Sequence, residues 1–192
     1  MVFFYVANLI GYVRVGCLLL ASAFSKNTET FLQFYVTSYL LDAVDGTAAR
    51  ALGGTSKFGS VLDMVTDRAS TAILLALLQE PFWLFCLILD ISSHWFHVSA
   101  SMSKAANSHK ESTNKFLSFY YNRGVLFIVC FLSEAFLCHQ FLLKRGYLLQ
   151  DWSWLLWIFG PTFYFKQIIN IVQLIEACKN LSKLENTKLF MY

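Results

Sequence analysis

Six stretches of mostly apolar residues alternate with short polar breaks along the chain. They cover about residues 3–24, 31–50, 60–79, 81–101, 123–142 and 152–175. Each stretch is long enough for a helix that crosses the hydrocarbon core of a bilayer, which takes about 20 residues. The breaks contain polar residues or turn formers such as Gly53 and Gly54. The pattern predicts an all-α integral membrane protein with a bundle of six transmembrane helices.

The composition strengthens this prediction and excludes several classes of protein. Hydrophobic residues make up 57% of the 192 residues and charged residues 14%, whereas soluble domains carry about 25% charged residues. No polar stretch is long enough for a separate soluble domain. We therefore expect one membrane domain over residues 1–192, ending in a mixed-charge tail at 179–192.

The distribution of charged residues predicts the orientation of the chain in the membrane. The net charge of +3 is too small to indicate nucleic-acid binding. Lysines are more frequent in the breaks after the second and fourth stretches and in the tail, which predicts that these breaks and both termini face the cytosol.

The five cysteines lie in apolar stretches without a CxxC pair, so we expect buried thiols and no disulfide frame. The N-terminus lacks the basic region of a cleaved signal peptide.

Four aspartates in the second and third stretches form the most informative pattern. Asp42 and Asp45 are three residues apart, and Asp63 and Asp67 are four apart, so each pair shares one helical face. The glycines between the stretches predict an antiparallel helical hairpin. Asp42 lies eight residues before Arg50, and Asp67 lies eight residues after Gly59, so both are about 12 Å into their helices. We therefore expect the two pairs to meet at one depth, near the cytosolic headgroup level. The alternative interpretation is that these aspartates only cap helices around a turn. The presence of four acids at this spacing disfavours that interpretation.

Four neighbouring carboxylates cannot all stay ionised without a counter-charge. One or two divalent cations would supply it, and all-oxygen ligands favour Mg²⁺ or Mn²⁺ over zinc. Such a centre is suited to binding a diphosphate and to phosphoryl-type transfer. Gly46 and Ala49 keep the helix surface low beside it, Arg50 can pair with a phosphate, and Ser56 can hydrogen-bond to a nucleotide.

The complete motif is DxxDGxxAR, eight residues, then GxxxDxxxD, and it resembles the signature of the CDP-alcohol phosphatidyltransferases, membrane enzymes with six transmembrane helices. Its positions are filled by Asp42, Asp45, Gly46, Ala49, Arg50, Gly59, Asp63 and Asp67. The segments Asn8–Arg14, Ser93–His97 and Ser108–Lys110 are similar to members that make phosphatidylinositol.

The resemblance implies transfer of the phosphatidyl group from CDP-diacylglycerol to myo-inositol with release of CMP, in the endoplasmic reticulum membrane. Homodimers occur in this family. Asp42, Asp45 and Asp63 would hold the metal, and Asp67 would contribute to the metal site and act as the base. Contacts with CDP-diacylglycerol would come from Gly46, Ala49, Arg50, Ser56, Gly59 and Asn8.

The site of the acceptor is less defined. Asp90, His94, His97 and Ser101 form a polar stripe at helical spacing, which either contacts inositol or makes interhelical hydrogen bonds. His109 and Arg123 would shape the acceptor site or gather the anionic lipid, or would be ordinary cytosolic charges. A zinc site at the histidines lacks a third ligand. Glu134 receives no role.

Three other functions remain open from the residues. The same chemistry could use serine, glycerol phosphate or an amino alcohol as acceptor. A divalent-cation transporter also carries aspartates in its spans, although these acids gather at one membrane face. A catalytically inactive scaffold is disfavoured because no signature aspartate is missing.

Overall fold

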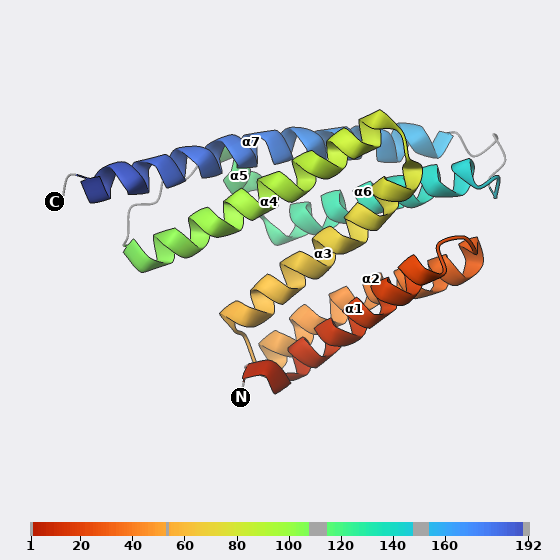
Figure 1. Cartoon of the computed structure of the whole chain (residues 1–192), viewed down its shortest axis with the longest axis horizontal. Coiled ribbons are helices and arrows are strands. Elements are labelled where there is room, and N and C mark those ends of the chain that lie inside the picture. Colours follow the sequence, from red (N-terminus) through yellow and green to blue (C-terminus); the bar gives the residue numbers. More distant parts are fainter. Residues whose placement is uncertain (1, 53, 108–114, 148–153, 190–192) are drawn as a thin grey trace. The chain divides into compact units, whose positions relative to one another are not determined.

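The computed structural model describes residues 2–52, 54–107, 115–147 and 154–189, which form helices and no strands (Figure 1). The helices are η1 (Val2–Phe4), α1 (Val6–Ala23), α2 (Thr28–Ala51), α3 (Lys57–Leu78), α4 (Pro81–Asn107), α5 (Lys115–Tyr120), α6 (Arg123–Lys144) and α7 (Leu155–Leu189). Each of the six predicted stretches coincides with one long helix. The short α5 lies in a segment expected as loop, and α7 continues into the expected tail.

Two asparagines explain where helices begin. Asn27 precedes α2, and its side chain accepts a hydrogen bond of 3.1 Å from the backbone N–H of Thr30. Asn122 precedes α6 and accepts one of 3.1 Å from Gly124 N–H. Each side chain satisfies a backbone donor that the first turn of a helix leaves unpaired.

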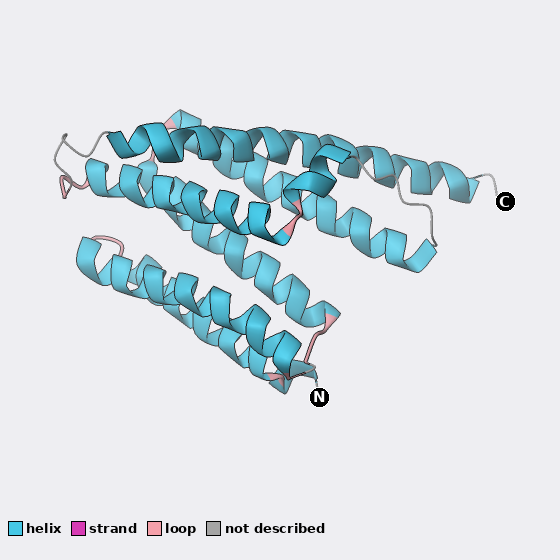
Figure 2. Ribbon diagram, turned by 180° about the vertical axis from the view of Figure 1, so that it is seen from behind, coloured by secondary structure: helices cyan, strands magenta, loops and turns pink. Residues whose placement is uncertain are grey.

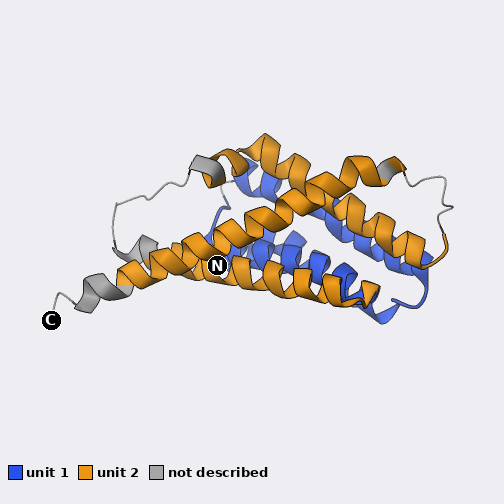
Figure 3. Ribbon diagram, turned by 90° about the horizontal axis from the view of Figure 1, so that it is seen from above, with its two compact units in different colours: residues 1–77 blue, residues 78–192 orange. Residues whose placement is uncertain are grey.

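The chain divides into two compact units, Met1–Leu77 and Leu78–Tyr192 (Figure 3). In the first unit, α1 and α2 run side by side as an antiparallel pair (Figure 2). Phe31 and Tyr35 of α2 are buried there and stack with ring centroids 5.6 Å apart. Helix α3 comes close to α1 at Gly11, where a Cβ atom would lie 2.8 Å from Leu62 Cδ2. Gly11 therefore permits the close packing of these two helices.

Aromatic side chains join the three long helices of the second unit. Trp83 of α4 and Phe136 of α6 both contact Phe163 of α7, with ring centroids 5.8 and 4.9 Å apart. All three rings are buried. Large aromatic rings contribute much of the packing energy in such cores, so α7 is the helix on which α4 and α6 assemble.

Polar side chains of α7 also bind both neighbours. Asn170 donates a 3.1 Å hydrogen bond to Asp90 of α4, and Lys166 Nζ lies 3.9 Å from Glu134 Oε1 of α6. All four side chains are buried. Asp90 of the polar stripe thus makes an interhelical hydrogen bond, which is one of the two roles that the sequence pattern predicted for the stripe. Glu134, for which the sequence pattern predicted no role, lies beside the buried cation of Lys166.

The described helices have the exterior of a membrane protein. Helices α1 and α6 are long and apolar enough, by length and composition, to cross a bilayer. Large apolar side chains such as Leu19, Phe85, Ile88 and Phe127 are exposed, whereas several charged ones lie inside. A soluble protein seldom shows so much exposed apolar surface, so the chain is an all-helical membrane protein.

The cysteines follow the prediction in part. None of the five forms a disulfide, and Cys86 is buried. Cys17, Cys130 and Cys138 are only partly buried, and Cys178 is exposed on α7, so the expectation of a uniformly buried set was wrong. The position of each cysteine on its helix fixes which way the side chain points, and an apolar stretch alone does not specify that direction.

Candidate active site

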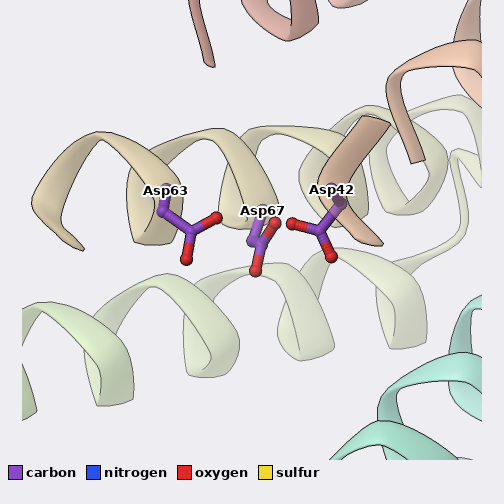
Figure 4. Close-up of side chains that lie close together, drawn as sticks. All are labelled: Asp42, Asp63 and Asp67. Atoms are coloured by element: carbon purple, nitrogen blue, oxygen red, sulfur yellow. The ribbon is translucent and has the colours of Figure 1, made fainter. Parts of the chain in front are cut away.

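Three of the four predicted aspartates converge between α2 and α3. One carboxylate oxygen from each of Asp42, Asp63 and Asp67 lies within 4.8 Å of the others. Figure 4 shows the three carboxyl groups turned toward one another, with Asp67 between Asp63 and Asp42. This arrangement brings Asp42 of the first acidic pair together with both acids of the second pair.

The guanidinium group of Arg14 on α1 connects all four acids. Its Nη1 lies 2.8 Å from Asp42 Oδ1, 2.7 Å from Asp45 Oδ2 and 2.8 Å from Asp63 Oδ1. Its Nη2 lies 2.5 Å from Asp67 Oδ1. Asp45 is outside the three-acid set but shares the same cation.

Burial differs across this cluster. The side chain of Arg14 is 2% exposed and that of Asp45 is 9% exposed, whereas Asp42 and Asp67 are each 35% exposed and Asp63 is 51% exposed. The site therefore has a closed side, formed by Arg14 and Asp45, and an open side. Three acids on the open side could accept a cation or a substrate from solution.

The charges of the cluster do not balance. Four carboxylates face one guanidinium, which leaves a formal excess of three negative charges when all are ionised. Uncompensated charge in a partly buried site is costly. The carboxylate oxygens of the cluster are ligands of the kind that Mg²⁺ and Mn²⁺ prefer. The residues present therefore fit a divalent metal centre.

A pocket of about 250 Å³ adjoins the cluster and includes Asp45 and Asp63 in its wall. The six residues predicted to contact CDP-diacylglycerol all line it: Asn8, Gly46, Ala49, Arg50, Ser56 and Gly59. The sequence pattern thus selected side chains that come together from α1, α2 and the segment leading into α3.

Close contacts explain why a glycine stands at position 59. A Cβ atom there would lie 2.6 Å from Asn8 Oδ1 and 3.1 Å from Ser56 Oγ. The backbone N–H of Gly59 donates a 2.9 Å hydrogen bond to Ser56 Oγ, and buried Asn8 donates one of 2.7 Å to the carbonyl of Val2. A larger residue would push these polar groups apart.

A second pocket, of about 180 Å³, is apolar. It is lined by residues of α1 and α3 that include Val15, Leu18, Val65 and Ile73. Leu62 lines both pockets. The first unit therefore offers polar and apolar binding space on either side of one leucine.

The predicted acceptor residues belong to the second unit or lie outside the described residues. His97 Nε2 is 3.4 Å from the hydroxyl of Tyr121, two residues before the exposed Arg123. His94 instead turns its Nδ1 to the carbonyl oxygen of Asp90 in its own helix, 2.8 Å away. His109 lies outside the described residues.

The sequence-based selection of site residues omitted Arg14 and Tyr121. Arg14 gave a usable signal, because a lone arginine in an apolar stretch needs acidic partners. Tyr121 gave none, since one tyrosine among 9 in the chain is unremarkable until its contact with His97 is known.

Comparison with known proteins identifies the class. Residues 4–159 match the model of the family described as CDP-alcohol phosphatidyltransferase, and the chain belongs to this family.

Two relatives are similar to this chain over most of their own length. The chain is 43% identical over 187 residues to CDP-diacylglycerol--inositol 3-phosphatidyltransferase of Saccharomyces cerevisiae, covering 92% of this chain and 85% of the relative. It is 38% identical over 200 residues to the Homo sapiens protein of the same name, covering 96% and 94%. No solved structure is similar enough to this chain to count as a match.

Proposed function

We propose that this protein synthesises phosphatidylinositol by transferring the phosphatidyl group of CDP-diacylglycerol to myo-inositol. An inositol hydroxyl attacks the phosphorus that carries diacylglycerol, the bond from this phosphorus to CMP breaks, and CMP leaves. The observation that carries the proposal is the aspartate set beside a pocket lined by the signature residues. The inositol acceptor is supported by the names of the yeast and human relatives.

Asp42, Asp63 and Asp67, with Asp45 beside them, would hold Mg²⁺ or Mn²⁺. Two oxygens bound to one magnesium ion lie at most about 4.2 Å apart, which is near the 4.8 Å limit of the three-acid set. When bound, such ions neutralise the charge that develops on a diphosphate and on its leaving group.

The chain's own residues would do the rest. Arg50 binds a phosphate oxygen through its planar fork, and Asn8 and Ser56 hydrogen-bond to the nucleotide. Glycines 46 and 59 and Ala49 leave space for it beside the backbone. Asp67 takes the proton of the attacking hydroxyl. The apolar pocket across Leu62 suits a substrate whose diphosphate is attached to lipid.

The acceptor site would be formed by the second unit. The contact of His97 with Tyr121 beside Arg123 supports these residues, and hydroxyl and imidazole groups suit a polyol. His94 is a weaker candidate because its ring already faces the carbonyl of Asp90. His109 remains a candidate from the sequence alone.

The proposed setting is a single catalytic membrane domain over residues 1–192. Six spans would cross the endoplasmic reticulum membrane, with both termini and the active site on the cytosolic side. This topology lets the lipid substrate approach from the bilayer while inositol and CMP exchange with the cytosol. A homodimer is the assembly that family resemblance suggests.

The test is a transfer assay with the purified full chain in phosphatidylcholine vesicles. CDP-diacylglycerol is offered with labelled inositol, serine or glycerol phosphate, first with chelator and then with restored Mg²⁺ or Mn²⁺. We expect metal-dependent labelling of lipid by inositol alone. Asp42→Asn should abolish it, and the control Glu80→Gln, an exposed acid between α3 and α4, should not.

The other outcomes would each indicate a different protein. Labelling by serine and not by inositol would overturn the acceptor. Cation flux into the vesicles without lipid product would favour a transporter. A folded protein that produces no lipid with any acceptor would favour an inactive scaffold.

A further inference from the structure

We propose that Arg14 is a positioning residue that holds the four aspartates together and competes with divalent cations for them. Without a bound cation, its guanidinium is the counter-charge that keeps the acids assembled. The inference rests on the proposed function, because it assumes that cations bind at these aspartates.

The first argument is that Arg14 depends wholly on these acids. Its side chain is 2% exposed, so water does not solvate the charge. A buried cation without acidic partners is strongly unfavourable. In turn, four acids from α2 and α3 would repel one another without it, because like charges a few ångströms apart destabilise each other. Arg14 and the aspartates therefore stabilise one another across three helices.

The second argument is that the acids are poorly matched to one guanidinium. Nη1 has two hydrogens, which it donates to Asp45 and Asp63, yet Asp42 Oδ1 also lies 2.8 Å from it. Meanwhile Nε is buried without a hydrogen-bond partner among the described residues. One nitrogen thus serves three carboxylates while another donor is unused.

The third argument is the capacity that remains on the acids. Each carboxylate has two oxygens, and the contacts with Arg14 engage one oxygen of each. The open side of the cluster holds the more exposed acids. The hydrogen-bond donors of Arg14 are therefore incompletely paired. The aspartates keep negative charge and carboxylate oxygens with which they can bind a cation of higher charge.

Competition has a definite thermodynamic consequence. A charge at this distance from an ionised group changes its equilibria by about tenfold to 1,000-fold. Removal of the positive charge should therefore tighten cation binding, although it destabilises the cation-free protein. A residue with a merely structural role would lower stability equally with and without the cation.

The experiment measures Mn²⁺ binding by electron paramagnetic resonance on the purified full chain, together with thermal unfolding followed by circular dichroism, because the unit that contains Arg14 has no tryptophan. We expect Arg14→Gln to bind Mn²⁺ at least tenfold more tightly than wild type. Its melting temperature should be lower than that of wild type without Mn²⁺ and should recover most of the difference at saturating Mn²⁺. Arg14→Lys, whose ammonium can contact fewer carboxylates, should bind Mn²⁺ with intermediate affinity.

The matched control is Lys166→Gln. It also removes a buried cation from an ion pair, that with Glu134, but in the other unit. It should lower the melting temperature by the same amount with and without Mn²⁺ and leave Mn²⁺ affinity unchanged.

The outcomes separate the two levels of the proposal. If wild type shows no saturable Mn²⁺ binding, both the proposed metal-dependent function and the role of Arg14 are wrong. If wild type binds Mn²⁺ but Arg14→Gln binds it equally or more weakly, the competition is wrong and the proposed function stands. Should Arg14→Gln not be recovered even with Mn²⁺, Arg14→Lys decides, and unchanged or weaker binding by it overturns the competition.

Discussion

Asn8 of α1 and Gly59 of α3 approach so closely that a Cβ atom on residue 59 would lie 2.6 Å from Asn8 Oδ1. Both residues line the pocket beside the aspartates. The contact brings α1 against the start of α3, where Gly59 is the first residue of the motif GxxxDxxxD. The shape of the pocket therefore depends on the absence of a side chain at residue 59.

Gly59→Ala should impair binding of CDP-diacylglycerol, because the added methyl group displaces the Asn8 amide and the Ser56 hydroxyl. We expect at least about a tenfold loss of kcat/KM for this substrate, since disturbed positioning of a substrate commonly costs that much. The measurement is initial rate against CDP-diacylglycerol concentration.

Gly16→Ala is the control for that variant. A Cβ atom at Gly16, also in α1, would meet nothing within 4 Å, and alanine favours a helix over glycine by about 1 kcal/mol. This variant should keep wild-type rates. Equal rates for both variants would mean that the close contact at Gly59 is unimportant for binding.

Asp67→Asn should reduce transfer by at least about 100-fold, the usual contribution of a positioned general base. The amide keeps the size of the side chain but cannot accept the hydroxyl proton. The protein should still insert and bind CDP-diacylglycerol, which equilibrium binding of labelled lipid would measure. Turnover near the wild-type rate would remove Asp67 as the base.

Asp63→Asn should weaken metal dependence and activity together, because its carboxylate is the most exposed of the set and faces the pocket. The measurement is activity against Mn²⁺ concentration. We expect the half-saturating concentration to rise by about tenfold. An unchanged titration would contradict a ligand role for this residue.

Tyr121→Phe should raise the KM for inositol several-fold while leaving the KM for CDP-diacylglycerol unchanged. The variant removes the hydroxyl that lies 3.4 Å from His97 Nε2 and keeps the ring in place. Tyr164→Phe, on an exposed part of α7, is the matched control. Parallel changes in both KM values would point to a general effect on folding.

Asn170→Leu should destabilise the second unit, because it removes the donor that binds buried Asp90 across helices. Loss of a hydrogen bond to a buried polar group costs about 1–3 kcal/mol. Thermal unfolding in detergent would measure this, with Ile171→Leu, at the exposed neighbouring position, as control. Unaltered unfolding would show that the bond contributes little.

The amino-acid sequence by itself determined the helices and the four acids of the site. Apolar runs, turn formers and the spacing of Asp42, Asp45, Asp63 and Asp67 are properties of neighbouring residues, and local geometry converts them directly into helices with acidic faces. The residues lining the polar pocket were also available, because they lie within one motif and the segment before it.

Only the tertiary structure decided which distant side chains complete these features. Arg14 reaches acids 28 to 53 positions away, Lys166 pairs with Glu134, and Tyr121 contacts His97. Such pairings depend on how each helix is rotated about its axis and on where its neighbours pack. Residue spacing along a single helix contains no information about that rotation relative to another helix.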